Sequence, residues 1–180
     1  MNDRIYNKGV DRLRSEDRLK RLEIDKVVSF CLKDKKVKTL LDIGTGSGLF
    51  AEAFSKLGIA ISGIDINKEM IEAAKSYIPE GQFLIAPAEE IPFNDESFDS
   101  SFLGLVFHEV NDYKKSLSEA YRVTNSFTFI LEWQHKQEDF GPPIEHRLKP
   151  EFIENMAFSV GYKNVNIFSL STLVLYILEK

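Results

Sequence analysis

The feature that most constrains this chain is a glycine-rich turn that directly follows a short apolar run. Residues 38–43 form the run, glycines stand at alternate positions of residues 44–48, and a helical pattern begins at once. Glycine permits a tight turn and lets backbone amides approach a ligand closely, because it has no Cβ. A helix that starts at such a turn directs its unpaired amides to the same place. A second apolar run, residues 59–64, ends on an acid, Asp65, so the pattern predicts an α/β fold that binds a nucleoside.

The spacing of the glycines argues against two common nucleotide-binding loops. Counted from Gly44, the dinucleotide pattern G-x-G-x-x-G/A requires a small residue where Leu49 stands. The phosphate loop G-x-x-x-x-G-K-[ST] is excluded because no Lys-Ser or Lys-Thr pair follows. The pattern present is D-x-G-x-G-x-G, which places Asp42 beside the turn. An acid at that position suits a cationic ligand and disfavours a pyrophosphate.

Length, charge and cysteine content set the frame. The chain has 180 residues, of which 43% are hydrophobic, which is enough for one good core and one domain. A net charge of −5 and an isoelectric point near 5.3 argue against general nucleic-acid binding. The single cysteine, Cys31, cannot form an intramolecular disulfide, and we expect it in the core. With no apolar stretch long enough to span a membrane and no signal peptide, we expect a cytoplasmic protein.

Strand-like and helical segments alternate along the chain, which predicts a parallel sheet covered on both faces. The expected strands are residues 38–43, 59–64, 82–86, 100–105 and 127–133, and the expected helices are 17–32, 48–57, one from 67, 113–123 and 150–160. The tail differs, because residues 164–169 and 172–179 are separated by too few residues for a helical crossover. We therefore expect a Rossmann-like three-layer sandwich, with a mostly parallel seven-stranded sheet and an antiparallel C-terminal hairpin.

The whole chain, residues 1–180, is predicted to be a single domain with two appendages to its core. Residues 1–33 form a helical lid segment, of which residues 6–18 are expected to close over the ligand. Residues 34–180 form the core, in which residues 134–149 are a loop insertion after the fifth strand. Substrate choice should come from these two parts, although a plain surface linker is an equal alternative for the insertion. Before the fifth strand we expect a turn in which Asn125 adopts a positive φ.

Two further stretches make the chain similar to a known family. Residues 86–99 read Ala-Pro-Ala-Glu-Glu-Ile-Pro-Phe-Asn-Asp-Glu-Ser-Phe-Asp, and residues 103–110 read Leu-Gly-Leu-Val-Phe-His-Glu-Val. With D-x-G-x-G-x-G, they resemble the small class I S-adenosylmethionine-dependent methyltransferases, the broad group that includes ubiquinone and menaquinone C-methyltransferases. The terminal hairpin also favours this family over a dinucleotide dehydrogenase. The resemblance covers about residues 38–132.

The resemblance implies S-adenosylmethionine as the cofactor. It assigns cofactor binding to Asp42, Gly44, Thr45, Gly46, Gly48, Asp65, Ile66, Ala88, Glu89 and Leu103. Asp42 suits the cofactor's amine, Asp65 can accept both ribose hydroxyls, and Ile66 matches the residue that stacks on adenine. Pro87 stands where the family has the acid that accepts the adenine amine, so the Ala88 backbone or Glu89 would have to substitute.

The resemblance implies a methyltransferase that acts on a small-molecule acceptor of unknown identity. His108 is the candidate catalytic base, with a purely structural histidine as the alternative. Because methyl transfer demands few catalytic side chains, a cofactor-binding but catalytically silent regulatory or partner subunit is the alternative function. We expect no metal, because no close His/Asp/Glu cluster resembles a metal site. The sequence leaves monomer and homodimer equally open.

Overall fold

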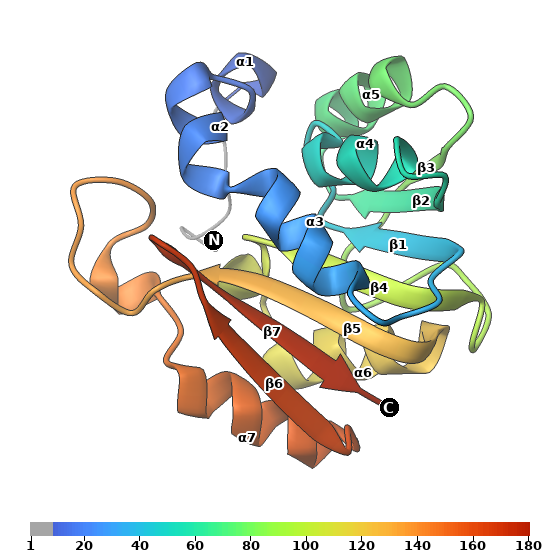
Figure 1. The fold of residues 1–180 in the computed structure, drawn as a ribbon. Coiled ribbons are helices and arrows are strands. Elements are labelled where there is room, and N and C mark those ends of the chain that lie inside the picture. The colour runs from blue at the N-terminus through green and yellow to red at the C-terminus, as the bar shows by residue number, and fades with distance from the viewer. Residues whose placement is uncertain (1–8) are drawn as a thin grey trace.

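A seven-stranded sheet forms the middle layer of the molecule (Figure 1), and the computed structural model describes residues 9–180. The strands are β1 (Thr39–Ile43), β2 (Ala60–Asp65), β3 (Gln82–Ile85), β4 (Phe98–Gly104), β5 (Thr124–Trp133), β6 (Asn164–Ser169) and β7 (Leu173–Glu179), in the spatial order β3-β2-β1-β4-β5-β7-β6. The pairs among β1 to β5 are parallel, whereas β7 is antiparallel to β5 and β6. The predicted parallel sheet with an antiparallel terminal hairpin is confirmed.

Helices cover both faces of this sheet. They are α1 (Val10–Leu13), α2 (Glu16–Leu22), α3 (Ile24–Leu32), α4 (Leu49–Ser55), α5 (Lys68–Tyr77), α6 (Tyr113–Val123) and α7 (Pro150–Val160), with short 3₁₀ turns η1 (Phe107–Glu109) and η2 (Ile144–His146). Figure 1 shows α3, α4 and α5 on the near face and α6 and α7 on the far face.

The alternation of side chains along the strands divides the core into two layers. Leu40 and Phe102 pack with the buried side chains of α3, α4 and α5. The next residue of each strand, Leu41 or Leu103, packs with those of α6 and α7. Because successive strand residues point to opposite faces, a central strand that is covered on both faces contributes apolar side chains to both layers. Cys31 lies in the first layer and is fully buried, as expected.

The helix expected over residues 17–32 is wrong, because the chain breaks at Glu23. This residue has a φ of 45° and separates α2 from α3. Its carboxylate accepts a hydrogen bond from the Ser171 backbone N–H at 2.8 Å, which holds the break against the loop before β7. As a result α2 lies at the carboxyl edge of the sheet, whereas α3 packs flat against the core.

The turn expected before β5 is also wrong. Helix α6 ends at Val123, and β5 begins at the next residue with an extended Thr124. Asn125 is not among the residues with positive φ. A direct change from helix to strand needs no left-handed residue there.

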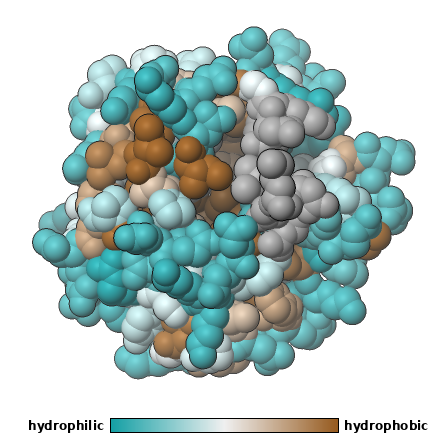
Figure 2. Space-filling view, turned by 180° about the vertical axis from the view of Figure 1, so that it is seen from behind, coloured by the Kyte–Doolittle hydropathy of each residue, from teal (hydrophilic) through white to brown (hydrophobic). Residues whose placement is uncertain are grey.

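The surface shown in Figure 2 is mainly hydrophilic and carries small apolar patches. The large exposed apolar side chains lie on separate elements and are Leu57, Ile66, Tyr77, Ile85, Phe158 and Ile167. Within residues 9–180, no helix is long and apolar enough to cross a membrane.

Candidate active site

The order of the strands places a crevice at the carboxyl ends of β1 and β4. Strand β1 pairs with β2 on one side and with β4 on the other, so the chain departs in opposite directions from this point. Ligands of open α/β sheets bind at such switch points. A cavity of about 1300 Å³ lies there, which exceeds the roughly 300–1,000 Å³ of a typical small-molecule pocket. It has room for a nucleoside and a second molecule.

The glycine-rich turn after β1 forms the floor of this cavity. Gly44, Gly46 and Gly48 have φ values of 68°, 53° and 74°, a region that favours glycine. A Cβ on Gly44 would lie 2.4 Å from the Val106 side chain, and one on Gly48 would lie 3.1 Å from Ala74. The lack of a Cβ therefore permits close packing at Gly44 and Gly48, and Gly44 and Gly46 both line the cavity.

Asp42 lies under the turn and is 2% exposed. Its carboxyl accepts a hydrogen bond from the Thr45 hydroxyl at 2.7 Å. Burial raises the pKa of Asp42 to about 7, and the nearby charge of Asp65 adds to the rise, whereas the Thr45 hydrogen bond opposes it. A buried carboxyl in this state gains most from a ligand cation that can pair with it.

Asp65 is the last residue of β2, and each of its carboxylate oxygens accepts a hydrogen bond from a backbone N–H group. One oxygen accepts a hydrogen bond from the Gly46 N–H at 2.9 Å, and the other accepts one from the Asn67 N–H at 2.8 Å. Burial raises the pKa of Asp65, and the hydrogen bonds from backbone N–H groups oppose the rise. Because a carboxylate oxygen can accept more than one hydrogen bond, the held carboxylate can accept one further donor on each oxygen.

An apolar ledge adjoins Asp65. Ile66 is 52% exposed at the cavity, beside Ala86 and Ala88. Glu89 also lines the cavity, but one of its carboxylate oxygens accepts hydrogen bonds from the backbone N–H groups of Asn111, at 2.7 Å, and Asp112. The apolar ledge can stack against the flat face of a base. The hydrogen bonds of Glu89 connect the ledge to the residues that precede α6.

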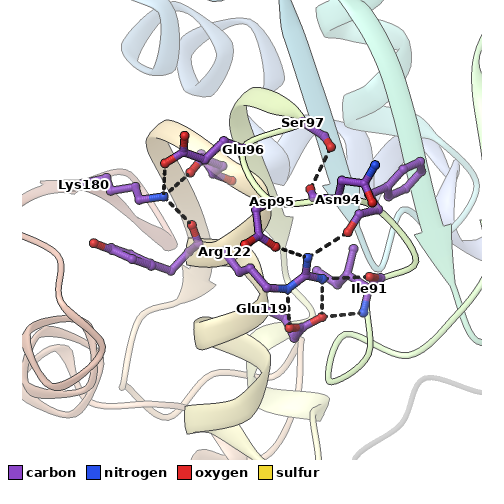
Figure 3. A network of polar contacts seen from close by, with 11 residues as sticks. Ile91, Asn94, Asp95, Glu96, Ser97, Glu119, Arg122 and Lys180 are labelled. Carbon is purple, nitrogen blue, oxygen red and sulfur yellow. Dashed lines mark hydrogen bonds and ion pairs between the residues drawn. The ribbon is translucent and has the colours of Figure 1, made fainter.

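A network around Arg122 of α6 anchors the segment that follows this ledge (Figure 3). The guanidinium binds both carboxylate oxygens of Glu119 and donates to the carbonyl oxygens of Ile91 and Phe93. Glu119 in turn accepts a hydrogen bond from the Ile91 N–H at 2.8 Å. The side-chain hydrogen bond to Glu119 is the main cause that raises the pKa of Arg122. The ledge is thereby held to a rigid helix.

On the opposite side of the cavity, His108 is paired with a buried acid. His108 is 4% exposed, and its Nδ1 lies 2.8 Å from Oε2 of Glu132, the next-to-last residue of β5. The other oxygen of Glu132 accepts a hydrogen bond from the His108 backbone N–H at 3.0 Å. A carboxylate at Nδ1 fixes the ring so that Nε2 is the basic nitrogen of the neutral imidazole. Nε2 lies 3.7 Å from Glu109.

Helices α1 and α2 contribute residues to the lining of the same cavity. A Cβ on Gly46 would lie 3.1 Å from the Leu13 side chain, so Leu13 lies close to the turn. Arg14 donates hydrogen bonds to the Ser47 carbonyl at 2.8 Å and to Glu52 at 2.7 Å, and its guanidinium stacks 3.4 Å from the Tyr77 ring centroid. Residues 6–8 of the predicted lid lie outside the described residues, whereas Leu13 and Arg14 contact the glycine-rich turn.

The insertion after β5 forms the remaining wall. Trp133 and Phe140 line the cavity with ring centroids 5.8 Å apart, and His146 also lines it. Arg147 is 4% exposed and donates hydrogen bonds to three carbonyl oxygens, those of Gln134, Phe140 and Pro142. The insertion is therefore a fixed wall and not only a linker.

The structure brings most of the predicted site residues together at this cavity. The lining includes Asp42, Gly44, Thr45, Gly46, Asp65, Ile66, Ala88, Glu89 and His108. Gly48 and Leu103 lie outside the lining: Gly48 packs on α5, and Leu103 is fully buried in the core. Gly104 and Leu105 line the cavity in place of Leu103.

Glu132, which binds His108, is not among the site residues predicted from the sequence. The sequence does contain a pattern that could have predicted Glu132. Like Asp42 and Asp65, it stands at or next to the end of an apolar strand. The carboxyl ends of parallel strands share one edge of the sheet, so all three acids meet there. Among residues 9–180, no group of three or more His, Cys, Asp or Glu side chains could hold a metal ion.

Part of the chain that carries this arrangement is similar to known proteins. Residues 41–129 match the model of a family described as a methyltransferase domain. A demethylmenaquinone methyltransferase of Renibacterium salmoninarum is 29% identical over 103 residues, which cover 57% of this chain and 44% of that protein. A ubiquinone/menaquinone biosynthesis C-methyltransferase of Geotalea daltonii is 38% identical over 103 residues, covering 49% and 44%. The chain thus spans less than half of the length of these relatives.

A solved structure has the same fold over nearly the whole length of this chain. The crystal structure of a methyltransferase from Aquifex aeolicus, described as dependent on S-adenosylmethionine, has a TM-score of 0.85 to this chain. The two share 24% sequence identity, and the alignment covers 94% of this chain and 96% of the other.

Proposed function

We propose that this chain is a class I S-adenosylmethionine-dependent methyltransferase and that it transfers the cofactor's methyl group to a small-molecule acceptor. The observation that carries the proposal is Asp65, whose two oxygens each hold one backbone N–H beside an exposed Ile66. That arrangement suits a ribose diol with a base stacked next to it. The cofactor supplies a methyl group on a sulfonium, which is already activated for transfer.

The cavity residues fit such a cofactor without any phosphate site. Asp42 would face the amine of the amino acid portion, Asp65 would accept the ribose hydroxyls, and Ile66 would stack on the adenine. The backbone at Ala88 would border the adenine edge, since Glu89 is engaged with α6. Gly46 and Thr45 would border the amino acid portion from the turn.

We assign His108 the role of base for acceptors that lose a proton. The acceptor's proton would pass to Nε2 of His108 as the bond from the acceptor atom to the methyl carbon forms and the bond from that carbon to sulfur breaks. Glu132 would stabilise the resulting imidazolium through Nδ1, as carboxylates do for histidine bases. The pair is buried, so the charge it carries is little screened by water.

The two appendages would exclude water and select the acceptor. Residues 1–33 are proposed as the lid, because Leu13 and Arg14 hold its described part against the glycine-rich turn. Closure over a sulfonium aligns the acceptor and prevents side reactions. The net charge of −5 and the buried free thiol of Cys31 support a cytoplasmic enzyme without general nucleic-acid affinity.

Calorimetric titration with S-adenosylmethionine and, in parallel, NADH tests the cofactor. We expect micromolar affinity for the first alone, a loss of at least tenfold in Asp65→Asn, and no change in Asp25→Ala, which removes an exposed acid of α3. Release of S-adenosylhomocysteine in the presence of acceptors separates an enzyme from a silent binding subunit. Binding of NADH, or equal affinity in Asp65→Asn, would contradict the proposal.

A further inference from the structure

Resting on the proposed function, we infer that the acceptor is an organic anion whose acidic group binds Arg21 at the mouth of the cavity. This deepens the proposal by naming the class of the acceptor: a molecule with an apolar body, a carboxylate or similar group at one end, and a methyl-accepting atom at the other. Four features of the described residues carry the inference.

The first feature is the face that α2 presents to the cavity. Arg18, Arg21 and Leu22 line the cavity, whereas Leu19 and Lys20 do not. Residues three and four apart share one face of a helix, so the arginines flank the buried Leu22 on the inner side. The break at Glu23 directs this face toward the cavity.

The second feature is the state of the Arg21 guanidinium. It lies 4.9 Å from the centroid of the Phe140 ring, within the range of a cation–π contact. Two acids, Asp17 and Asp139, line the same mouth, yet no carboxylate among residues 9–180 forms an ion pair with Arg21 within 4.0 Å. Arg21 is thus positioned by an aromatic ring while its charge is not neutralised by an acid, which leaves its donors for a ligand.

The third feature is the rigidity of the wall that holds Phe140. Arg147 binds the carbonyl oxygens of Phe140 and of two other residues of the insertion. The Arg21 carbonyl accepts a hydrogen bond from the Thr172 hydroxyl at 3.5 Å, so the α2 side is also tied to the sheet. A preorganised guanidinium loses little freedom on binding an anion, which favours affinity.

The fourth feature is the apolar lining of the cavity that Arg21 and His108 share. Phe50, Leu105, Trp133 and Phe140 contribute to this lining. An apolar body would cover these side chains, while the guanidinium fixes the far end in a bidentate contact. The anchored end therefore sets which atom of the acceptor faces His108 and the methyl group.

Binding of matched acids and amides to the protein saturated with S-adenosylhomocysteine tests the inference. The probes are phenylacetate and hexanoate, each paired with its primary amide, together with phenyl phosphate to distinguish carboxylate from phosphate recognition. Affinities are measured by calorimetry for the wild-type protein, Arg21→Gln, Arg21→Lys and the control Lys20→Gln on the outer face of the same helix. The affinity for S-adenosylhomocysteine is measured for every variant.

We expect at least one acid to bind about ten to a hundred times more tightly than its amide in the wild type and in Lys20→Gln. Arg21→Gln should abolish this preference, and Arg21→Lys should retain part of it. Equal binding of acids and amides, no binding by any probe, or a preference that persists in Arg21→Gln would overturn the inference. If neither the wild-type protein nor any variant binds S-adenosylhomocysteine, the proposed function itself fails. If the wild type and all variants bind it equally, the results on acids and amides test only the acceptor class.

Discussion

Replacement of Asp42 by asparagine should make the protein more stable at alkaline pH and weaker in cofactor binding. Burial raises the pKa of Asp42 from 3.8 to about 7 in the folded state. Between these two values the folded protein holds a proton that the unfolded chain has released, so the free energy of unfolding falls as pH rises. At about 1.4 kcal/mol for each pH unit, the wild type loses about 4 kcal/mol between pH 4 and pH 8.

Asparagine keeps the shape of the protonated acid but cannot ionise. Its side-chain oxygen can still accept the Thr45 hydroxyl, so the loss at that contact is about 1 kcal/mol or less. At pH 8, Asp42→Asn should therefore exceed the wild type by about 2–3 kcal/mol, or roughly 5–10 °C in melting temperature. The same change removes the partner of the cofactor's amine and should weaken S-adenosylmethionine about ten- to a hundredfold.

Urea denaturation from pH 5 to pH 8 measures the first effect, and calorimetry measures the second. Thr45→Val is the matched control, because it removes the hydrogen bond that lowers the pKa of Asp42 and leaves the carboxyl buried. In this control the loss of stability should persist and extend to higher pH. An unchanged pH dependence in Asp42→Asn would refute the assignment of the titrating group to Asp42.

Three further substitutions test the other contacts of the site. Glu132→Gln should slow methylation of acceptors that lose a proton about a hundredfold, because His108 loses the acid that stabilises its charged form. Steady-state kinetics measures this loss, and calorimetry should show an unchanged affinity for the cofactor. Arg14→Met should speed dissociation of S-adenosylmethionine about tenfold in stopped-flow measurements, because the lid loses its bonds to Ser47 and Glu52. Arg122→Met should lower the free energy of unfolding by about 2 kcal/mol in urea titrations and also weaken the cofactor, because the segment beside the adenine ledge loses its anchor.

The sequence predicted the parts of this molecule that depend on local patterns. Apolar runs that alternate with helical periods determine the sheet, and the short connection before β7 requires a hairpin. The break at Glu23 could not be predicted in this way, because its carboxylate is bound by Ser171, a residue far away in the chain. The same holds for Gly48, whose lack of a Cβ serves packing on Ala74 rather than contact with the cavity.

The three acids at the carboxyl edge of the sheet show why the site depends on the surrounding fold. Asp42 and Glu132 are almost fully buried, and Asp65 carries a raised pKa, so the folded chain bears an electrostatic cost at this edge. Backbone N–H groups offset part of it at each acid: Gly46 and Asn67 at Asp65, His108 at Glu132, and Ala51 at Asp42. Asp42 has only the Thr45 hydroxyl among its side-chain partners, and its pKa rises to about 7. Asp42, whose pKa stays raised despite these hydrogen bonds, is the acid that would face the cofactor's cation, so binding should relieve the cost that folding leaves in place.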